Sequence, residues 1–203
     1  MKLLHLDSSI LGQNSVSRQL SADIVQKISH QVQPVIVKYR DLADNPIPHL
    51  SGAYLAASGS PGTGHDSTLQ SELALSSEVL NEFINADVVV IGAALYNFSI
   101  PSQLKAWIDR IAINGKTFRY TEAGPVGLVG DKKIILAIAR GGYYGHGSSA
   151  EALEHAESYL RAIFSFIGVT KLQVVIAEGH NVGPDHRTRA LDIAAQQVAA
   201  LVI

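Results

Sequence analysis

Three short stretches of this sequence contain side chains that could hold a small molecule. Residues 7–17 supply hydroxyl groups, on Ser8, Ser9, Ser15 and Ser17. Residues 94–98 and 139–145 supply aromatic side chains, one amide and a pair of adjacent glycines. Hydroxyl groups at the start of a helix bind phosphate, and apolar and aromatic side chains form the walls of small-molecule sites. Together the stretches predict a site for a flat ring that carries a phosphate.

The hydroxyl-rich stretch has two interpretations. A single serine before a helix is equally well explained as its N-cap. Several hydroxyl groups beside Gly12 favour phosphate binding by Ser9, Ser15 and Ser17. Because neither GxxxxGK[ST] nor GxGxxG is present, a phosphate monoester is favoured over ATP or the pyrophosphate of a dinucleotide.

The other two stretches would face the ring. Residues 95–98 offer apolar and aromatic surface with one amide. Gly141 and Gly142 would let the backbone approach the ring closely. Their N–H groups would then point at one edge of the ring, where negative charge accumulates if the ring is a redox cofactor such as a flavin and becomes reduced. By itself, an aromatic stretch after a strand is more often a loop anchor that packs on the core. The glycine pair by itself is equally consistent with an ordinary turn.

Alternating patterns along the chain define the elements that would position these stretches. Apolar, strand-like runs occupy residues 2–6, 34–39, 87–93, 133–139 and 171–177. Helical patterns follow at 17–30, 68–85, 101–111, 149–167 and 184–202, with Ser99 as a candidate N-cap. Residues 40–67 and 116–131 are rich in turn formers, so we expect a surface excursion and an exposed flap.

This alternation predicts an α/β fold. We expect a doubly wound, five-stranded parallel sheet of flavodoxin-like order 2-1-3-4-5 that spans residues 1–203 as one domain. Ligands of such sheets bind at the carboxyl ends of the strands, where the strand order reverses between the first and third strands. The three stretches follow the first, third and fourth strands, so the topology brings them together. FMN is the obvious phosphorylated flat ring for this sheet.

Composition excludes several other functions. The 203 residues include no cysteine, which removes disulfides, thiolate metal sites and cysteine nucleophiles, so any redox chemistry needs a bound cofactor. No HExxH or GxSxG sequence occurs, and Glu151 and His155 are expected to form a solvated pair on one helix. We therefore expect no metal site and no catalytic side chain.

Charge and hydropathy indicate the partners. A net charge of -2 without a basic cluster argues against nucleic-acid or membrane-surface binding. The apolar runs are too short for a signal peptide or a membrane span, so we expect a cytoplasmic protein.

The sequence resembles the FMN-dependent NADH-azoreductases, flavodoxin-like homodimers that are also described as NADH:quinone oxidoreductases. The resemblance extends nearly from end to end. It rests on SSIL at 8–11, SVS at 15–17, RDLA at 40–43, NPIP at 45–48, YNF at 96–98, IPSQLK at 100–105, TFRYTE at 117–122, GP at 124–125, RGG at 140–142, FIG at 166–168 and AEG at 177–179.

The resemblance implies a role for each matching residue. The FMN phosphate would be held by Ser9, Ser15, Val16 and Ser17. The ribityl chain and ring would contact Leu95, Tyr96, Asn97 and Phe98. The other ring edge would lie against Ala139, Arg140, Gly141 and Gly142. Tyr120, on the flap, would reach the substrate side of the partner subunit's flavin.

The chain departs from the family pattern beside the ring. The family commonly has Pro-Met-Tyr-Asn-Phe and Ser-Arg-Gly-Gly, whereas this chain has Ala94 and Leu95 before Tyr96, and Ala139 before Arg140. Leucine keeps the bulk of methionine. Ala139 removes a hydroxyl, so only backbone contacts to the flavin remain there, and FMN affinity or potential is expected to shift.

The resemblance also implies an activity. Tightly but non-covalently bound FMN would take hydride from NADH and then reduce a quinone or azo compound, in a ping-pong cycle that needs no catalytic protein acid or base. The alternative is a flavodoxin-type electron carrier with little NADH turnover. Such carriers are often strongly acidic, so the nearly neutral net charge favours the enzyme. A third class is an interaction domain without a cofactor.

Overall fold

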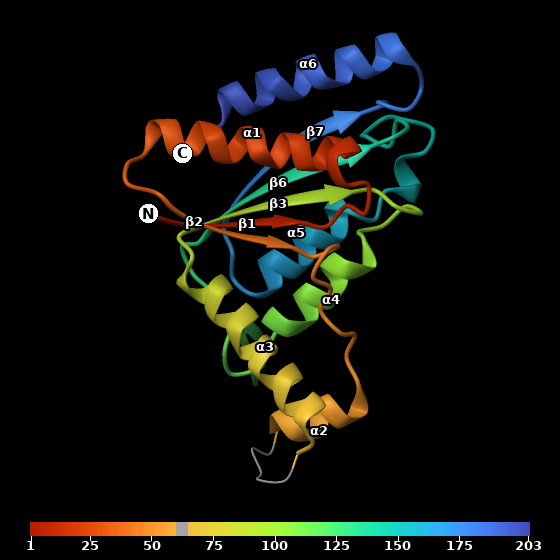
Figure 1. Ribbon diagram of the computed structural model, residues 1–203. Coiled ribbons are helices and arrows are strands. Elements are labelled where there is room, and N and C mark those ends of the chain that lie inside the picture. Colours follow the sequence, from red (N-terminus) through yellow and green to blue (C-terminus); the bar gives the residue numbers. More distant parts are fainter. Residues whose placement is uncertain (60–64) are drawn as a thin grey trace.

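The computed structural model describes residues 1–59 and 65–203, and its centre is a five-stranded parallel sheet (Figure 1). The strand order is β2-β1-β3-β6-β7. Every neighbouring pair is parallel. The strands are β1 (Lys2–Asp7), β2 (Ile36–Asp41), β3 (Val88–Ala94), β6 (Lys133–Arg140) and β7 (Lys171–Glu178). The predicted order is confirmed, because β4 (Phe118–Thr121) and β5 (Gly124–Gly127) form a separate two-stranded sheet and add only to the numbering.

Helices cover both faces of the sheet (Figure 1). One face carries α1 (Val16–Gln31) and α6 (Pro184–Ala200). The other carries α3 (Ser67–Asn85), α4 (Ser102–Ile111) and α5 (Glu157–Phe166). Their apolar residues recur at helical spacing, as with Leu20, Ile24 and Ile28 of α1, which are buried.

Burial on both faces explains the central strand. All seven residues of β3 are buried, as the continuous apolar run predicts for a strand between two helical layers. Two apolar cores result, one on each face of the sheet. The sheet therefore holds the carboxyl ends of β1, β3 and β6 at one edge of a rigid body.

The segment predicted as a surface excursion contains a helix, α2 (Gly52–Gly59), that lies away from the sheet in Figure 1. Its Tyr54 is buried, and the guanidinium carbon of Arg110 lies 3.8 Å from the centre of that ring. Arg110 also donates to the carbonyl of Pro48 at 2.7 Å. These tertiary contacts stabilise a helix too short to be evident from the sequence. The predicted turn residues Pro61, Gly62 and Gly64 lie outside the described residues.

The helix predicted over residues 149–167 is divided. A 3₁₀ turn occupies Glu151–Leu153, and α5 begins only at Glu157. The carboxylate of Glu154 accepts from the N–H groups of Ala156 at 3.0 Å and Glu157 at 2.8 Å, which provides a new helix start. The predicted Glu151–His155 pair is therefore wrong, since Glu151 accepts from Nδ1 of His146 at 2.8 Å instead.

The predicted flap is a β-hairpin of β4 (Phe118–Thr121) and β5 (Gly124–Gly127). At its base Gly127 lies against the backbone of Gly168, after α5, so closely that neither position has room for a side chain. The predicted N-cap Ser99 is also wrong, because α4 begins at Ser102 and Pro101 occupies the N-cap position without a side-chain hydrogen bond to the helix.

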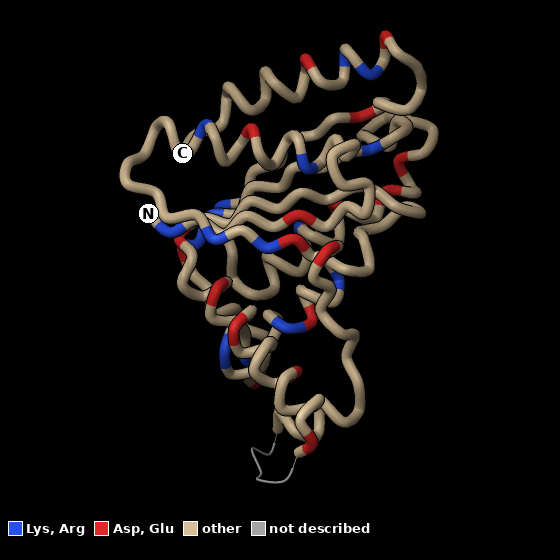
Figure 2. Tube along the Cα trace, viewed as in Figure 1, with Lys and Arg blue, Asp and Glu red and all other residues tan. Residues whose placement is uncertain are grey.

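Charged residues of both signs are scattered over the trace (Figure 2). Within residues 1–59 and 65–203, no helix combines the length and the apolar character of a membrane span.

Candidate cofactor site

A cleft of about 410 Å³ opens at the carboxyl ends of β1, β3, β6 and β7. Most of the predicted residues line it, namely Ser9, Ser15, Val16, Leu95, Tyr96, Asn97, Phe98, Ala139, Gly141 and Gly142. Four further lining residues belong to the same three stretches, although no role was predicted for them individually, namely Leu11, Asn14, Ala94 and Tyr144. His180, Asn181 and Arg187 also line the cleft and lie outside the predicted stretches. The predicted convergence of the three stretches is therefore present in the structure.

The start of α1 forms one end of the cleft. Ser15 caps the helix, and its Oγ accepts from the N–H of Arg18 at 3.3 Å. Ser17 is fully buried, with its Oγ 3.1 Å from that of Ser15, so its hydroxyl supports Ser15 from behind. First-turn N–H groups have no partner within a helix, which leaves those of Val16 and Ser17 suited to an oxyanion.

An ion pair fixes the hydroxyl-rich loop from outside. Arg18 donates to the carbonyl of Ser9 through Nε at 3.1 Å and Nη2 at 2.7 Å, and also to the carboxylate of Asp41. Burial opposes ionisation of Asp41, but hydrogen bonds from Arg18 and the N–H groups of Ala43 and Asp44 lower its pKa. The pair is therefore charged at neutral pH and holds the backbone of Ser9 in place.

Asp7 opens the hydroxyl-rich stretch but has a structural role. Its carboxylate accepts from Ser21 Oγ at 2.7 Å and from the Tyr39 hydroxyl at 3.1 Å. Burial, together with the carboxylates of Asp7 and Asp41, raises the pKa of Tyr39, so its hydroxyl remains a donor.

The position of Asp7 also explains a glycine in the middle of β3. A Cβ on Gly92 would lie 2.5 Å from Asp7 Oδ1, so no larger residue fits there.

The second stretch forms a tight turn. Tyr96 and Ser99 each donate from the backbone N–H to the carbonyl of the other at 3.0 Å. Between them, Asn97 has φ 48° and Phe98 has φ 71°, as in a type I′ turn. Asparagine tolerates this conformation, but a bulky residue such as phenylalanine is strained in it. The turn leaves Phe98 42% exposed at the cleft.

The loops after β6 and β7 are joined to each other. The N–H of Gly179 donates to the carbonyl of Gly142 at 3.0 Å, and that of Asn181 donates to the carbonyl of Gly141 at 3.0 Å. A Cβ on Gly141 would lie 2.9 Å from the Asn181 side-chain nitrogen. Glycine at 141 thus allows the close packing of the loops.

Arg140 does not extend into this cleft. Its side chain is buried and pairs with Glu157 at 2.7 Å, Glu154 at 3.3 Å and Glu178 at 3.4 Å. These groups line a separate cavity of about 590 Å³. Only the backbone of Arg140, between Ala139 and Gly141, remains available to the predicted role.

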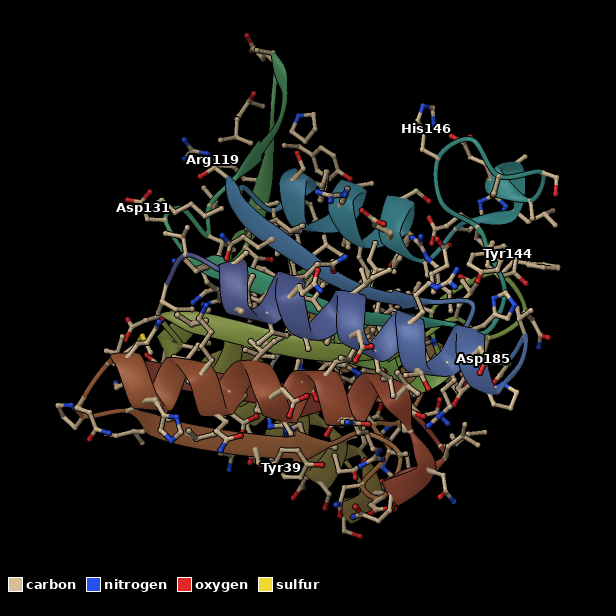
Figure 3. The ribbon with its side chains drawn as sticks, turned by 90° about the horizontal axis from the view of Figure 1, so that it is seen from above. Tyr39, Arg119, Asp131, Tyr144, His146 and Asp185 are labelled. Atoms are coloured by element: carbon tan, nitrogen blue, oxygen red, sulfur yellow. The ribbon has the colours of Figure 1, made fainter. Side chains whose placement is uncertain are left out.

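Tyr120 also lies outside the cleft of its own subunit. It is 69% exposed on β4, and its ring packs edge-on against Phe118 with centroids 5.5 Å apart. Figure 3 shows the hairpin, with Arg119 labelled, extending from the molecule well apart from Tyr144 of the cleft.

The chemistry of the cleft is that of a binding site. No Asp or Glu is among its described lining residues, and the part of the chain that the structure describes holds no cluster of three or more potential metal ligands. Burial lowers the pKa of His180, so this histidine is neutral near pH 7. The sheet order defines a flavodoxin-like protein. Its cleft has the size of a mononucleotide, with hydroxyl and N–H donors at one end and aromatic walls at the other.

Comparisons with known proteins agree. The family described as flavodoxin-like fold matches residues 1–202. An FMN-dependent NADH:quinone oxidoreductase of Xanthomonas campestris pv. campestris is 55% identical over 204 residues, covering 100% of both chains. A second one, from Bradyrhizobium diazoefficiens, is 55% identical and covers 99% of this chain and 98% of its own.

Solved structures point to the same group. The FMN complex of an FMN-dependent NADH-azoreductase from Bacillus anthracis has a TM-score of 0.87 at 30% identity, covering 97% of this chain and 95% of that one. The chain belongs to the flavodoxin-like family that includes these FMN-dependent oxidoreductases.

Proposed function

We propose that this protein is an FMN-dependent NADH oxidoreductase that reduces quinones and azo compounds. The relatives bear the name FMN-dependent NADH:quinone oxidoreductase, and similar structures are azoreductases. One observation carries the proposal. The start of α1, the Tyr96–Ser99 turn and the Gly141–Gly142 pair line a single cleft, where a phosphorylated ring would fit. None of the described residues that line this cleft carries a carboxylate.

The residues present fit FMN. Ser9 and Ser15, with the N–H groups of Val16 and Ser17, would hold the phosphate. Leu95, Asn97 and Phe98 would contact one side of the ribityl chain and ring. Ala139, Gly141 and Gly142 would present backbone to the other edge, since the glycines carry no side chain that would block a close approach.

Bound FMN would supply the two-electron chemistry, accepting hydride from NADH and reducing the quinone or azo compound. The chain's own residues would orient the reactants. Backbone N–H groups of Gly141 and Gly142 would stabilise negative charge at the ring edge. Phe98 and Tyr144, with ring centroids 6.1 Å apart, form an aromatic wall for a flat substrate. If donor and acceptor share this wall in turn, ping-pong kinetics follow.

A homodimer is part of the proposal. Tyr120, Val126 and Leu128 expose apolar surface on the hairpin, and Leu55 does so on α2. A second copy of the chain would cover these side chains and bring Tyr120 toward the partner's flavin. A cytoplasmic location also belongs to the proposal, because NADH is regenerated inside the cell.

An anaerobic titration tests the function. Protein loaded with FMN should lose its flavin absorbance after about one equivalent of NADH, and quinone should restore it within the turnover time. A flavodoxin-type electron carrier would bleach slowly and show negligible steady-state NADH oxidation. That second result would show that the protein is an electron carrier and not an NADH-dependent reductase.

A further inference from the structure

The cleft has one formally charged lining residue in the described chain, Arg187. Its other polar groups are hydroxyls, amides and the imidazole of His180, which is kept neutral by burial and by the nearby charge of Arg187. A phosphate monoester carries about -1.5 to -2 charges at pH 7. Hydroxyl and N–H groups donate hydrogen bonds to such a group but leave its charge uncompensated.

Arg187 is well placed to compensate that charge. It lies in the first turn of α6, where its N–H donates to the carbonyl of Gly183 at 2.9 Å. Helices α6 and α1 pack on the same face of the sheet (Figure 1). In Figure 3, Asp185, also in the first turn of α6, lies at the same end of the molecule as Tyr144 of the cleft. Arg187 and Ser15 therefore approach the cleft from neighbouring helices.

The side chain of Arg187 is also available. It is exposed, and no carboxylate of residues 1–59 or 65–203 forms an ion pair with it. In contrast, the buried Arg140 nearby is paired with three glutamates. A planar guanidinium binds two phosphate oxygens at once, which a lysine cannot do.

We propose that Arg187 is the counter-charge for the phosphate of the mononucleotide bound in this cleft, completing the set of donors on Ser9, Ser15 and the first turn of α1. This assignment rests on the proposed function. It places the phosphate between the two helices α1 and α6. It also gives α6, which follows the loop that carries Asn181, a direct part in binding.

Comparison of FMN with riboflavin isolates the phosphate, because the two differ only in that group. Dissociation constants are measured by quenching of flavin fluorescence for the unsubstituted protein, Arg187→Gln and the control Arg189→Gln, an exposed residue of α6 that does not line the cleft. Arg187→Gln should weaken FMN about tenfold or more and leave riboflavin within about twofold. Arg189→Gln should change neither. Added salt should weaken FMN less in Arg187→Gln than in the unsubstituted protein.

Three results would overturn the assignment. Equal losses of FMN and riboflavin would show that Arg187 supports the cleft rather than the phosphate. Unchanged FMN binding with a raised KM for NADH would assign the guanidinium to the phosphates of the dinucleotide. Unchanged FMN binding together with an unchanged KM for NADH would show that Arg187 contacts no phosphate of either nucleotide. Failure of the unsubstituted protein to bind FMN would refute the proposed function itself, a result distinct from these three.

Discussion

The hydroxyl of Ser9, after β1, lies 2.8 Å from the hydroxyl of Tyr96, after β3. This hydrogen bond joins two loops that are 87 residues apart in sequence at the point where the strand order reverses. Both residues line the cleft. The two stretches that sequence analysis selected for different chemistry, phosphate binding and ring contact, are thus parts of one hydrogen-bonded wall.

Tyr96→Phe should weaken FMN binding about fivefold, because one partly buried hydrogen bond contributes about 1 kcal/mol and its loss frees Ser9 to move. The measurement is a fluorescence titration with FMN. Tyr143→Phe is the matched control, since that hydroxyl bonds Nδ1 of His186 at the exposed rim. Equal FMN affinity in Tyr96→Phe and the unsubstituted protein would show that the bond does not organise the site.

Phe98→Gly should separate stability from function. Glycine removes the strain of a left-handed backbone at φ 71°, which is expected to stabilise the fold by about 1 kcal/mol. It also removes the aromatic wall facing Tyr144, so KM for a quinone should rise several-fold. Thermal unfolding and steady-state kinetics measure the two effects. A lower Tm with an unchanged KM would contradict both parts.

Gly141→Val should weaken FMN retention strongly, since its Cβ alone would come within 2.9 Å of the Asn181 side chain and separate the loops after β6 and β7. Retained flavin after gel filtration measures the effect. Gly52→Ala serves as the control, because a Cβ at that position has no neighbour within 4 Å. Full retention by Gly141→Val would place the flavin elsewhere.

Asp41→Asn tests the ion pair that holds the Ser9 loop. The folded-state pKa of Asp41 lies below its usual value, so its stabilisation is present above the usual carboxyl range, near pH 4, and disappears as pH falls through the folded pKa. Asp41→Asn should cost about 2 kcal/mol of unfolding free energy at pH 7. The difference should shrink toward pH 3. Urea titrations at both pH values measure it, and a constant difference would exclude the charged pair.

Val126→Asp tests the homodimer. The residue is exposed on β5, so a carboxylate there should leave the monomer folded but disfavour burial against a second copy. Sedimentation velocity should show a shift from dimer to monomer, accompanied by a loss of quinone reduction. Asp131→Asn, in the loop before β6, is a charge control that should remain dimeric. A dimer of unchanged stability in Val126→Asp would show that the hairpin is not part of the interface.

The sheet order could be predicted because each parallel strand is a continuous apolar run, such as Val88 to Ala94, bounded by helical periodicity. The same order placed the three selected stretches at one edge. Helix α2 could not be predicted, since it depends on Arg110 stacking on Tyr54 from a distant helix. The division of the helix after β6 depends on how the Glu154 side chain bonds nearby N–H groups, which residue type alone does not specify.

Two residues at the site show where prediction from sequence stops. The role of Arg140 at the ring edge stays a prediction for its backbone alone, because the charge of its side chain is satisfied by glutamates from α5, from β7 and from the segment before α5, and only the folded chain brings these together. Arg187 was not predicted because it lies in the first turn of α6, and the loop between β7 and that helix carries no hydroxyl group or glycine pair that would mark it as a binding loop. The carboxyl end of β7 lies at the same edge as the others, and that topology alone could have drawn attention to it.

A crystal structure of the protein with FMN would show directly where the flavin binds. We expect the phosphate within hydrogen-bond distance of Ser15 Oγ and the first-turn N–H groups of α1, with the ring between the Tyr96–Ser99 turn and Gly141. Flavin density at any other position, with this cleft empty or filled by protein side chains, would refute the proposed cofactor site.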